Sequence, residues 1–416
     1  MAAGDNSFQV CIIGDGAVGK AAALGLAQLG LRVALLGQSE GPKVGQTVGP
    51  AAGQRRVSED DWDARVFALN HCARALLDGV KVWSAMDASR INSVSAMHVT
   101  EFDLQTREVP KDAAVLQFDA YSAQVNELAW IVEEQNLRWA LDAALQFAQN
   151  VVRVPGVAQA LEFKADGVRV RCAQGEEICA ELVVGADGAF SWVRAQCELA
   201  LDYRSYDQQG VVCNFSCERP HRGVAYQWFV GAQGVIALLP LSGNRVSLVW
   251  SAPDTLAKEL MVQSAEQLAA RLFELSDEKL GRLSPLPSSS VRAFPLRLMR
   301  SPQMVSDRLA LVGDAAHVVH PLAGHGMNLG FGDVQALMTC LAERGVHRDC
   351  GDRRVLNRYQ RSRREEVDLM QWTTDGLSRL FANDLPAVRL VRRLGLNFLN
   401  QVPVLKRTLI AHAIGR

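Results

Sequence analysis

Short apolar runs that end in glycine recur at three places along the chain and predict buried strands followed by tight turns. The first is FQVCII at residues 8–13, which leads into GDGAVGK. The second is RVALLG at residues 32–37, and the third is DRLALVGD at residues 307–314. Between the first two, AAALGLAQLGL has the pattern of a helix. A strand, glycine turn, helix and strand within about thirty residues form a βαβ unit, so we predict an α/β fold.

The middle of the chain changes to successive β-type runs. Residues 210–251 contain GVVCNFSCE, GVAYQWFV, GVIALLPL and NRVSLVWS, separated by Gly or Asn turns. This spacing predicts an antiparallel sheet. Residues 63–83, 128–149 and 256–281 have helical patterns, and the chain beyond Gly332 is expected to be almost wholly helical. The prediction is therefore a mixed α/β (α+β) architecture.

Composition narrows the class of protein without deciding it. The 416 residues are 49% hydrophobic and 21% charged, which is typical of a globular protein. The formal net charge of −1 gives no overall electrostatic attraction to nucleic acid. No apolar run approaches the roughly 18 residues of a membrane-spanning helix, and the N-terminus lacks a signal-type pattern. The nine cysteines form no C-x-x-C pair, which favours reduced thiols in a cytoplasmic protein.

One local charge asymmetry stands out near the C-terminus. Residues 385–416 contain six basic residues and no acidic one, alternating with apolar stretches such as LGLNFL. A basic, amphipathic segment of this kind suits an anionic membrane surface or an acidic partner. A solvated helix end packed on its own protein explains the pattern equally well, and the sequence leaves both interpretations open.

The first glycine turn has the spacing of a dinucleotide-binding motif. Gly14, Gly16 and Gly19 form G-x-G-x-x-G after a predicted strand, and Ala17 and Val18 open the predicted helix. This context favours a pyrophosphate at the helix N-terminus over a purely structural glycine turn.

The acidic residue expected at the end of the second strand is absent. That position is Gly37, so Gln38 or Glu40 would have to hold the ribose. We expect a looser adenosine site, which Gly37→Glu would tighten.

A second glycine-rich turn follows the third strand, GDAAHVVHPLAGHGMNLG at residues 313–330. Asp314 at the strand end is a candidate to accept hydrogen bonds from ribityl or sugar hydroxyls. The stretch from Gly324 through Gly326 and Met327 to Asn328 places backbone N–H groups at a helix start, which suits the N1–C2=O edge of a flavin. The three histidines at 317, 320 and 325 also permit a metal site on spacing alone.

These motifs together resemble the FAD-dependent aromatic hydroxylases of the p-hydroxybenzoate hydroxylase type and, within that class, the ubiquinone biosynthesis hydroxylases (UbiH, UbiF, UbiI and VisC group). The resemblance covers essentially the whole chain. It rests on GDAAHVVHPLAGHGMNLG followed by FGDV, VVGADGAFSWVR, DARVFALNHCARALLDGVKVW and RWALDAAL. It implies a Rossmann-like FAD-binding domain with an inserted antiparallel substrate domain and a C-terminal helical region. The implied ranges are 1–75, 100–190 and 290–345 for FAD, 76–99 and 191–289 for the substrate, and 346–416 for the helices.

The resemblance also assigns roles to single residues. Arg65, Arg138 and Asp187 would contact the cofactor. His317 and His320 would brace the turn, which replaces the metal interpretation and leaves no expected metal. Pro321 would lie beside the flavin, and His325 stands where the family has glutamine, so pH-dependent flavin chemistry is expected. Pro321 and His325 are therefore the catalytic candidates.

The implied reaction is ring hydroxylation of a polyprenylated phenol through a flavin C4a-hydroperoxide, with O2 and either NADPH or NADH as co-substrates. Aromatic and aliphatic side chains of the antiparallel segment would line the substrate pocket, although they could equally form ordinary core. They are Tyr226, Trp228, Leu238, Pro240 and Trp250. The resemblance also suggests partner proteins of ubiquinone biosynthesis and a peripheral position at the inner membrane.

Two alternatives stay open from the sequence. The substrate could be a small soluble phenol or another secondary metabolite. The chain could also be a non-catalytic flavin-binding subunit of the ubiquinone biosynthesis complex, an interpretation to which Gly37 is the only pointer.

Overall fold

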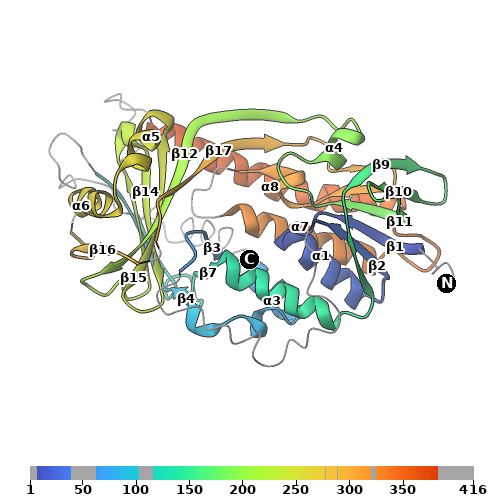
Figure 1. Ribbon diagram of the computed structural model, residues 1–416, viewed down its shortest axis with the longest axis horizontal. Helices are drawn as coiled ribbons and strands as arrows, with labels where there is room; N and C mark the ends of the chain where they lie inside the picture. The colour runs from blue at the N-terminus through green and yellow to red at the C-terminus, as the bar shows by residue number, and fades with distance from the viewer. Residues whose placement is uncertain are drawn as a thin grey trace.

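The structure is a computed structural model that describes residues 7–38, 62–102, 116–276, 278–287, 289–319 and 325–382. Two large sheets lie at opposite ends of the long axis, and a small three-stranded sheet lies between them (Figure 1). The long strand β12 (Asp202–Cys217) and its partner β17 (Arg292–Arg300) run along one side of the molecule from one end toward the other (Figure 1).

An eight-stranded sheet carries the predicted βαβ unit. Its parallel strands are β19, β11, β1, β2 and β8 in that order, and β18, β9 and β10 extend it. Helix α1 packs on this sheet, α3 and α7 pack on α1, and α8 packs on α7. The bounds are β1 (Ser7–Ile13), α1 (Ala17–Gln28), β2 (Val33–Gly37), α3 (Glu134–Phe147), β8 (Val151–Pro155), β9 (Ala158–Phe163), β10 (Val168–Cys172), β11 (Glu177–Gly185), β18 (Val305–Ser306), β19 (Leu309–Leu311), α7 (His325–Ala342) and α8 (Arg353–Ala382).

The predicted antiparallel sheet is also present, with nine strands. Its central strands pair in the order β17, β12, β15, β14 and β13, all antiparallel, and β13 then pairs β5 in parallel. Helices α5 (Asp254–Val262) and α6 (Ala265–Leu275) share a hydrophobic core with one face of it. The other bounds are β5 (Ala96–Glu101), β6 (Leu116–Asp119), β13 (Val224–Phe229), β14 (Val235–Leu241), β15 (Arg245–Pro253), β16 (Leu283–Pro285) and β20 (His317–Val318).

Three strands of this sheet come from segments that the sequence placed in the nucleotide domain. Strand β6 falls within 100–190, and β17 and β20 fall within 290–345, yet β6 pairs β5, β17 pairs β12 and β20 pairs β17. The nine-stranded sheet is therefore assembled from more of the chain than the central antiparallel segment.

The small sheet corrects two predicted helices. The segment 63–83 begins with β3 (Val66–Leu69) before α2 (His71–Gly79), and the segment 128–149 begins with β7 (Ala129–Glu133) before α3. Strand β7 pairs antiparallel with β3 and with β4 (Ile91–Val94). A short apolar run reads equally well as strand or as helix, and only these long-range partners decide between them.

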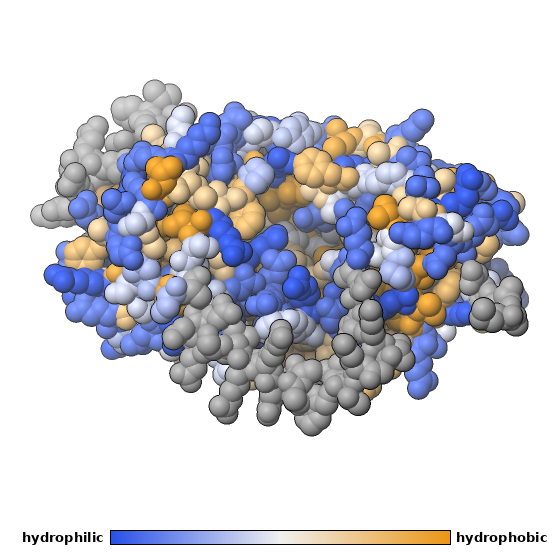
Figure 2. Space-filling view, viewed as in Figure 1, coloured by the Kyte–Doolittle hydropathy of each residue, from blue (hydrophilic) through white to orange (hydrophobic). Residues whose placement is uncertain are grey.

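The remaining elements are short. They are α4 (Trp192–Gln196) and the 3-10 turns η1 (Trp83–Ala85), η2 (Ala88–Arg90), η3 (Gly231–Gln233) and η4 (Gly313–Ala315). Among the described residues, no helix is long and apolar enough to cross a membrane. The face in Figure 2 mixes hydrophobic and hydrophilic side chains over both halves. The basic segment 385–416 lies outside the described residues.

Candidate cofactor site

The sequence-predicted turns meet at one edge of the eight-stranded sheet. Strands β1, β2, β11 and β19 are parallel neighbours, so their carboxyl ends share that edge. Gly14 follows β1, Gly37 ends β2, Asp187 follows β11 and Gly313 follows β19. In open α/β sheets, ligands bind outside the carboxyl ends of the strands. Segments that lie up to three hundred residues apart in sequence therefore surround one candidate site.

The glycines of the first turn divide into two kinds. Gly14 has φ +118°, and a Cβ there would lie 2.2 Å from the carbonyl oxygen of Ala186. A Cβ on Gly19 would lie 2.0 Å from the carbonyl oxygen of Gly14. By contrast, a Cβ on Gly16 would meet nothing within 4 Å. Gly14 and Gly19 are therefore needed for the close approach of neighbouring backbone, whereas Gly16 faces open space.

Gly16 is also the N-cap of α1, and no side chain caps it. Ala17 and Val18 begin the helix, whose first backbone N–H groups lack intrahelical partners. This arrangement fits a pyrophosphate at a helix N-terminus. Lys20 is not a phosphate ligand here, because its ammonium is buried and lies 2.8 Å from the Asp142 carboxylate.

The second glycine turn packs directly on the first. Gly313 has φ +61°, and a Cβ there would lie 3.2 Å from the Val18 side chain. A Cβ on Gly330 in α7 would lie 2.7 Å from the same side chain. Gly326, in the first turn of α7, has nothing within 4 Å of its Cβ position. Like Gly16, it leaves room beside a helix N-terminus.

A buried ionic network holds the second turn in place. Asp333 is fully buried in α7 and accepts hydrogen bonds from the backbone N–H of Gly313 at 2.9 Å and from Arg363 Nε at 2.7 Å. His317 Nε2 lies 2.7 Å from the same carboxylate. Burial alone would raise the pKa of Asp333. The charges and hydrogen bonds of His317 and Arg363 together lower this pKa by more than burial raises it, so the net shift is downward.

Only His317 of this network is expected from the sequence. His317 was expected to brace the turn, but its partners Asp333 and Arg363 were not singled out. Asp333 stands in FGDV, a motif that could have drawn attention. Arg363 lies in the charged run RSRREE, which is typical of a solvated helix face. Nothing local marks the one buried arginine in that run.

Asn328 ties the start of α7 to the small sheet. Its side chain donates to the carbonyl of Ala68 at 2.8 Å and accepts from the backbone N–H of Asn70 at 3.0 Å. Met327 packs against the main core. These contacts fix the position of the first turn of α7 relative to β3.

Asp314 and Arg65 influence each other electrostatically across the site. Desolvation by the surrounding protein raises the pKa of the Asp314 carboxyl group, while the positive charges of His317 and Arg65 oppose that rise. Arg65 is half-exposed, pairs with Glu134 at 3.4 Å and lies over the rings of Phe67 and Phe294. The Arg65 charge therefore acts on the Asp314 carboxyl group, and a contact of either residue with the cofactor stays a prediction.

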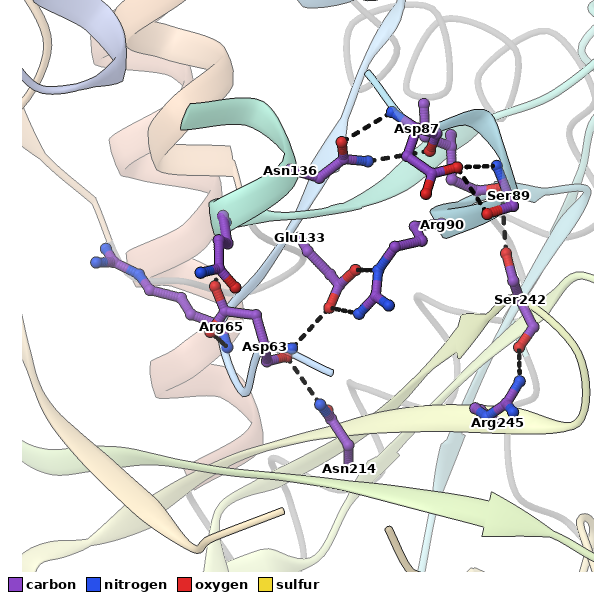
Figure 3. Close-up of polar contacts among 12 residues, drawn as sticks. Asp63, Arg65, Asp87, Ser89, Arg90, Glu133, Asn136, Asn214, Ser242 and Arg245 are labelled. Carbon is purple, nitrogen blue, oxygen red and sulfur yellow. Dashed lines mark hydrogen bonds and ion pairs between the residues drawn. The ribbon is translucent and has the colours of Figure 1, made fainter. Parts of the chain in front are cut away.

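Next to Arg65, a polar cluster joins the small sheet to the nine-stranded sheet (Figure 3). The buried Glu133 accepts from Arg90 Nε at 2.5 Å and from the backbone N–H of Asp63 at 2.6 Å. The Asn214 amide of β12 donates to the carbonyl of Asp63 at 2.8 Å. The Arg65 side chain extends away from this cluster (Figure 3). Asp63 therefore contacts the cluster, whereas Arg65, two residues later, is directed away from it.

The Asp187 carboxylate accepts hydrogen bonds from residues of its own loop. It accepts from Ser191 Oγ at 2.6 Å and from the backbone N–H of Val193 at 3.0 Å. Arg194 then donates to the carbonyl of Ala315, which links this loop to the second glycine turn. Asp187 thus shapes the rim of the site through hydrogen bonds inside the loop.

The other predicted cofactor residues are less constrained. Gln38 is exposed after β2, and Arg138 is exposed on α3. Pro321 and Gly324 lie outside the described residues, as does the side chain of His325, the first residue of α7.

The predicted substrate-pocket residues take a different position from the expected one. Trp228, Leu238 and Trp250 belong to the core shared with α5 and α6, and Trp250 Nε1 donates to the carbonyl of Gln233. Pro240 is buried two residues beyond Leu238 on β14, and Tyr226 stacks on Trp228 at 5.7 Å.

The opposite face of the same strands joins a separate core. Ala225 and Leu239 pack there with Ile131 of the small sheet and with Trp62, and Val249 packs against them. The expectation that Trp228, Leu238 and Trp250 roof a cavity is therefore corrected, because strand alternation turns them toward the helices.

Comparison with known proteins agrees with this geometry. The family model described as "FAD binding domain" matches residues 135–372. The 3-demethoxyubiquinol 3-hydroxylase of Escherichia coli is 35% identical over 98% of both chains. The ubiquinone hydroxylase UbiL of Rhodospirillum rubrum is 33% identical over 99% of this chain and 90% of its own.

Solved structures show the same fold at lower sequence identity. Pseudomonas aeruginosa PqsL, in complex with 2-aminobenzoylacetate, has a TM-score of 0.74 at 21% identity, covering 94% of this chain and 100% of that one. The p-nitrophenol 4-monooxygenase PnpA from Pseudomonas putida has a TM-score of 0.72 at 17% identity, covering 98% of each chain.

The FAD-binding family model and the similar ubiquinone hydroxylases identify a flavoprotein monooxygenase with FAD as its cofactor. The chain belongs to the family of FAD-dependent ubiquinone biosynthesis hydroxylases.

Proposed function

We propose that this protein hydroxylates the aromatic ring of a polyprenylated phenol in ubiquinone biosynthesis, using O2 and NADPH or NADH. The observation that carries the proposal is the contact of the two glycine turns through Val18, with open space at the Cβ positions of Gly16 and Gly326. The substrate class comes from the ubiquinone hydroxylases that are similar along nearly the whole chain.

When bound, FAD supplies oxygen activation and transfer to the ring. The residues of this chain position the cofactor. The N–H groups that begin α1 bind the pyrophosphate, with Gly16 leaving room for it. Asp314 accepts hydrogen bonds from hydroxyl groups of the cofactor, and Arg65 balances that carboxylate's charge.

At the reactive end, the positive end of the α7 dipole stabilises negative charge on the reduced cofactor. The His317–Asp333–Arg363 network holds the start of the second glycine turn at Gly313. We further propose that Arg138, Gln38, Asp187, Gly324 and Met327 line the cofactor site. We also propose Pro321 and His325 for the reactive end of the site, and this proposal rests on the family resemblance alone.

The test uses the full chain loaded with FAD. A tailed phenol should accelerate NAD(P)H oxidation and gain one atom of ¹⁸O from ¹⁸O2, read by mass spectrometry. The matched control is the same phenol without its tail. Hydroxylation of the tail-free phenol alone would favour a small soluble substrate. FAD binding without any oxygen incorporation would favour a non-catalytic subunit and overturn the proposal.

We also propose that the basic segment 385–416 brings the substrate site to an anionic membrane surface or to a partner enzyme of the same biosynthesis. Its charge pattern supports this. Full-length protein should co-sediment with anionic liposomes more strongly than a chain that ends at residue 384, with FAD content confirming that the shorter chain folds. Equal binding would contradict a membrane role for the segment.

A further inference from the structure

The end of strand β2 lacks the group that normally holds the adenosine ribose. In dinucleotide-binding βαβ units, an acidic side chain there hydrogen-bonds the ribose hydroxyls. Here β2 ends at Gly37, and the next residue, Gln38, is exposed. The chain nevertheless belongs to a family that binds FAD.

The missing side chain's place is taken by a carboxyl group from another element. A Cβ built on Gly37 would lie 2.3 Å from Asp15 Cγ, 2.4 Å from Asp15 Cβ and 2.7 Å from Asp15 Oδ2. Asp15 is the variable residue between Gly14 and Gly16 in the first glycine turn. Its carboxyl group thus stands where an acid at position 37 would begin.

The backbone explains why residues 15 and 37 meet. Strands β1 and β2 are parallel neighbours in register, with Ile13 opposite Leu36, and the N–H of Gly14 donates to the carbonyl of Leu36 at 2.9 Å. Two residues past this pairing, the turn carries Asp15 over the end of β2. Only a glycine at 37 leaves room for it.

We propose that Asp15 replaces the missing acid and accepts hydrogen bonds from the ribose hydroxyls of the FAD adenosine. The inference rests on FAD being the cofactor. The carboxylate leans toward the end of β2, while Gly16 on the other side stays open for the pyrophosphate. The adenosine site is therefore complete, with its acid supplied by the first turn instead of by the second strand.

This arrangement reverses the sequence-based expectation for Gly37→Glu. With Asp15 in place, a glutamate at 37 overlaps its side chain and sets two carboxylates against each other. The substitution should weaken FAD binding instead of tightening it. With Asp15 removed, the same glutamate has room to act as the ribose ligand.

The test is a double-mutant cycle on the apoprotein, with FAD affinity read from quenching of flavin fluorescence. Asp15→Gly and Gly37→Glu should each raise the Kd for FAD about tenfold, the scale of one hydrogen bond to a charged group. The Asp15→Gly, Gly37→Glu double variant should return to within about threefold of the parent, a strong non-additivity.

A third single variant separates ligand binding from folding. Asp15→Asn keeps the shape of the side chain but not its charge, so it should weaken FAD binding with little change in the apoprotein Tm. Parent-like affinity in Asp15→Asn and Asp15→Gly, or a double variant as weak as the sum of its parts, would overturn the inference. Failure of the parent protein itself to bind FAD would instead refute the FAD assignment.

Discussion

His317 Nε2 and Asp333 Oδ2 lie 2.7 Å apart with both side chains buried, and Arg363 Nε lies 2.7 Å from the other carboxylate oxygen. The carboxylate also accepts from the N–H of Gly313, the residue that opens the second glycine turn. One side chain of α7 therefore holds a turn, a strand and a second helix in fixed relation. The shape of the cofactor site depends on this one carboxylate.

Asp333→Asn should strongly destabilise the fold. The substitution removes the buried charge partner of Arg363 and leaves it only the half-exposed Glu366, and breaking a buried pair costs about 3–5 kcal/mol. Urea unfolding of the apoprotein measures the loss. Asp307→Asn is the control, because Asp307 pairs with Arg353 at the exposed surface and should cost about 1 kcal/mol or less. Equal effects in the two variants would contradict the role given to Asp333.

The same carboxylate predicts an acid limit to stability. The folded-state pKa of Asp333 is below its ordinary value, so its stabilisation is fully present above the unfolded pKa of about 3.9. The stabilisation is lost as pH falls through the folded pKa. The free energy of unfolding of the parent should therefore drop more steeply below about pH 4 than that of Asp333→Asn. Parallel pH curves would exclude this contribution.

Asp314→Asn should stabilise the apoprotein while weakening FAD binding. The folded-state pKa of Asp314 is raised, so its ionised form opposes folding as pH rises above the unfolded value of about 3.9. The variant's gain in Tm should be present at pH 7 and vanish as pH falls below that value. Asp166→Asn, in the exposed turn between β9 and β10, is the control and should change neither quantity. A lower Tm in Asp314→Asn would refute the argument.

Gly16→Ala should separate cofactor binding from folding. Gly16 has φ −69° and open space at its Cβ position, so alanine fits the apoprotein without strain. The added methyl group would occupy the approach of the pyrophosphate, and we expect the Kd for FAD to rise at least tenfold with the apoprotein Tm unchanged. Gly14→Ala is the contrast. It should destabilise the fold itself, because its Cβ would overlap the Ala186 carbonyl.

Trp250→Ala tests which face of the nine-stranded sheet is core. The indole is fully buried against α6, so truncation should cost about 3–5 kcal/mol in unfolding free energy. The KM for the aromatic substrate should stay near the parent value in the protein that remains folded. Val249→Ala, one residue away on the opposite face, is the matched variant. A large rise in KM at small stability cost for Trp250→Ala would restore it to the pocket.

The local sequence was sufficient to predict an element wherever the pattern that determines the element lies within one short segment. The strand–glycine–helix–strand order of residues 8–37 requires no distant partner to be recognised, because periodicity and glycine spacing lie within one βαβ unit. The same holds for the second turn at Gly313 and for the antiparallel runs after residue 210. These local patterns were enough to predict the mixed α/β fold, and the family resemblance that they carry predicted FAD as the cofactor.

Tertiary structure decided whatever depends on which segments meet. Strand β3 is a strand because β7 pairs with it, and Arg363 is buried because Asp333 lies opposite, though each segment alone reads otherwise. Strand alternation shows that Trp250 and Val249 face opposite ways, but only the packing of α6 shows which face is covered. The gap at Gly37 likewise looked like a lost ligand until the fold placed Asp15 beside it. Contacts between distant segments carry no local sequence signal, so they become visible only in three dimensions.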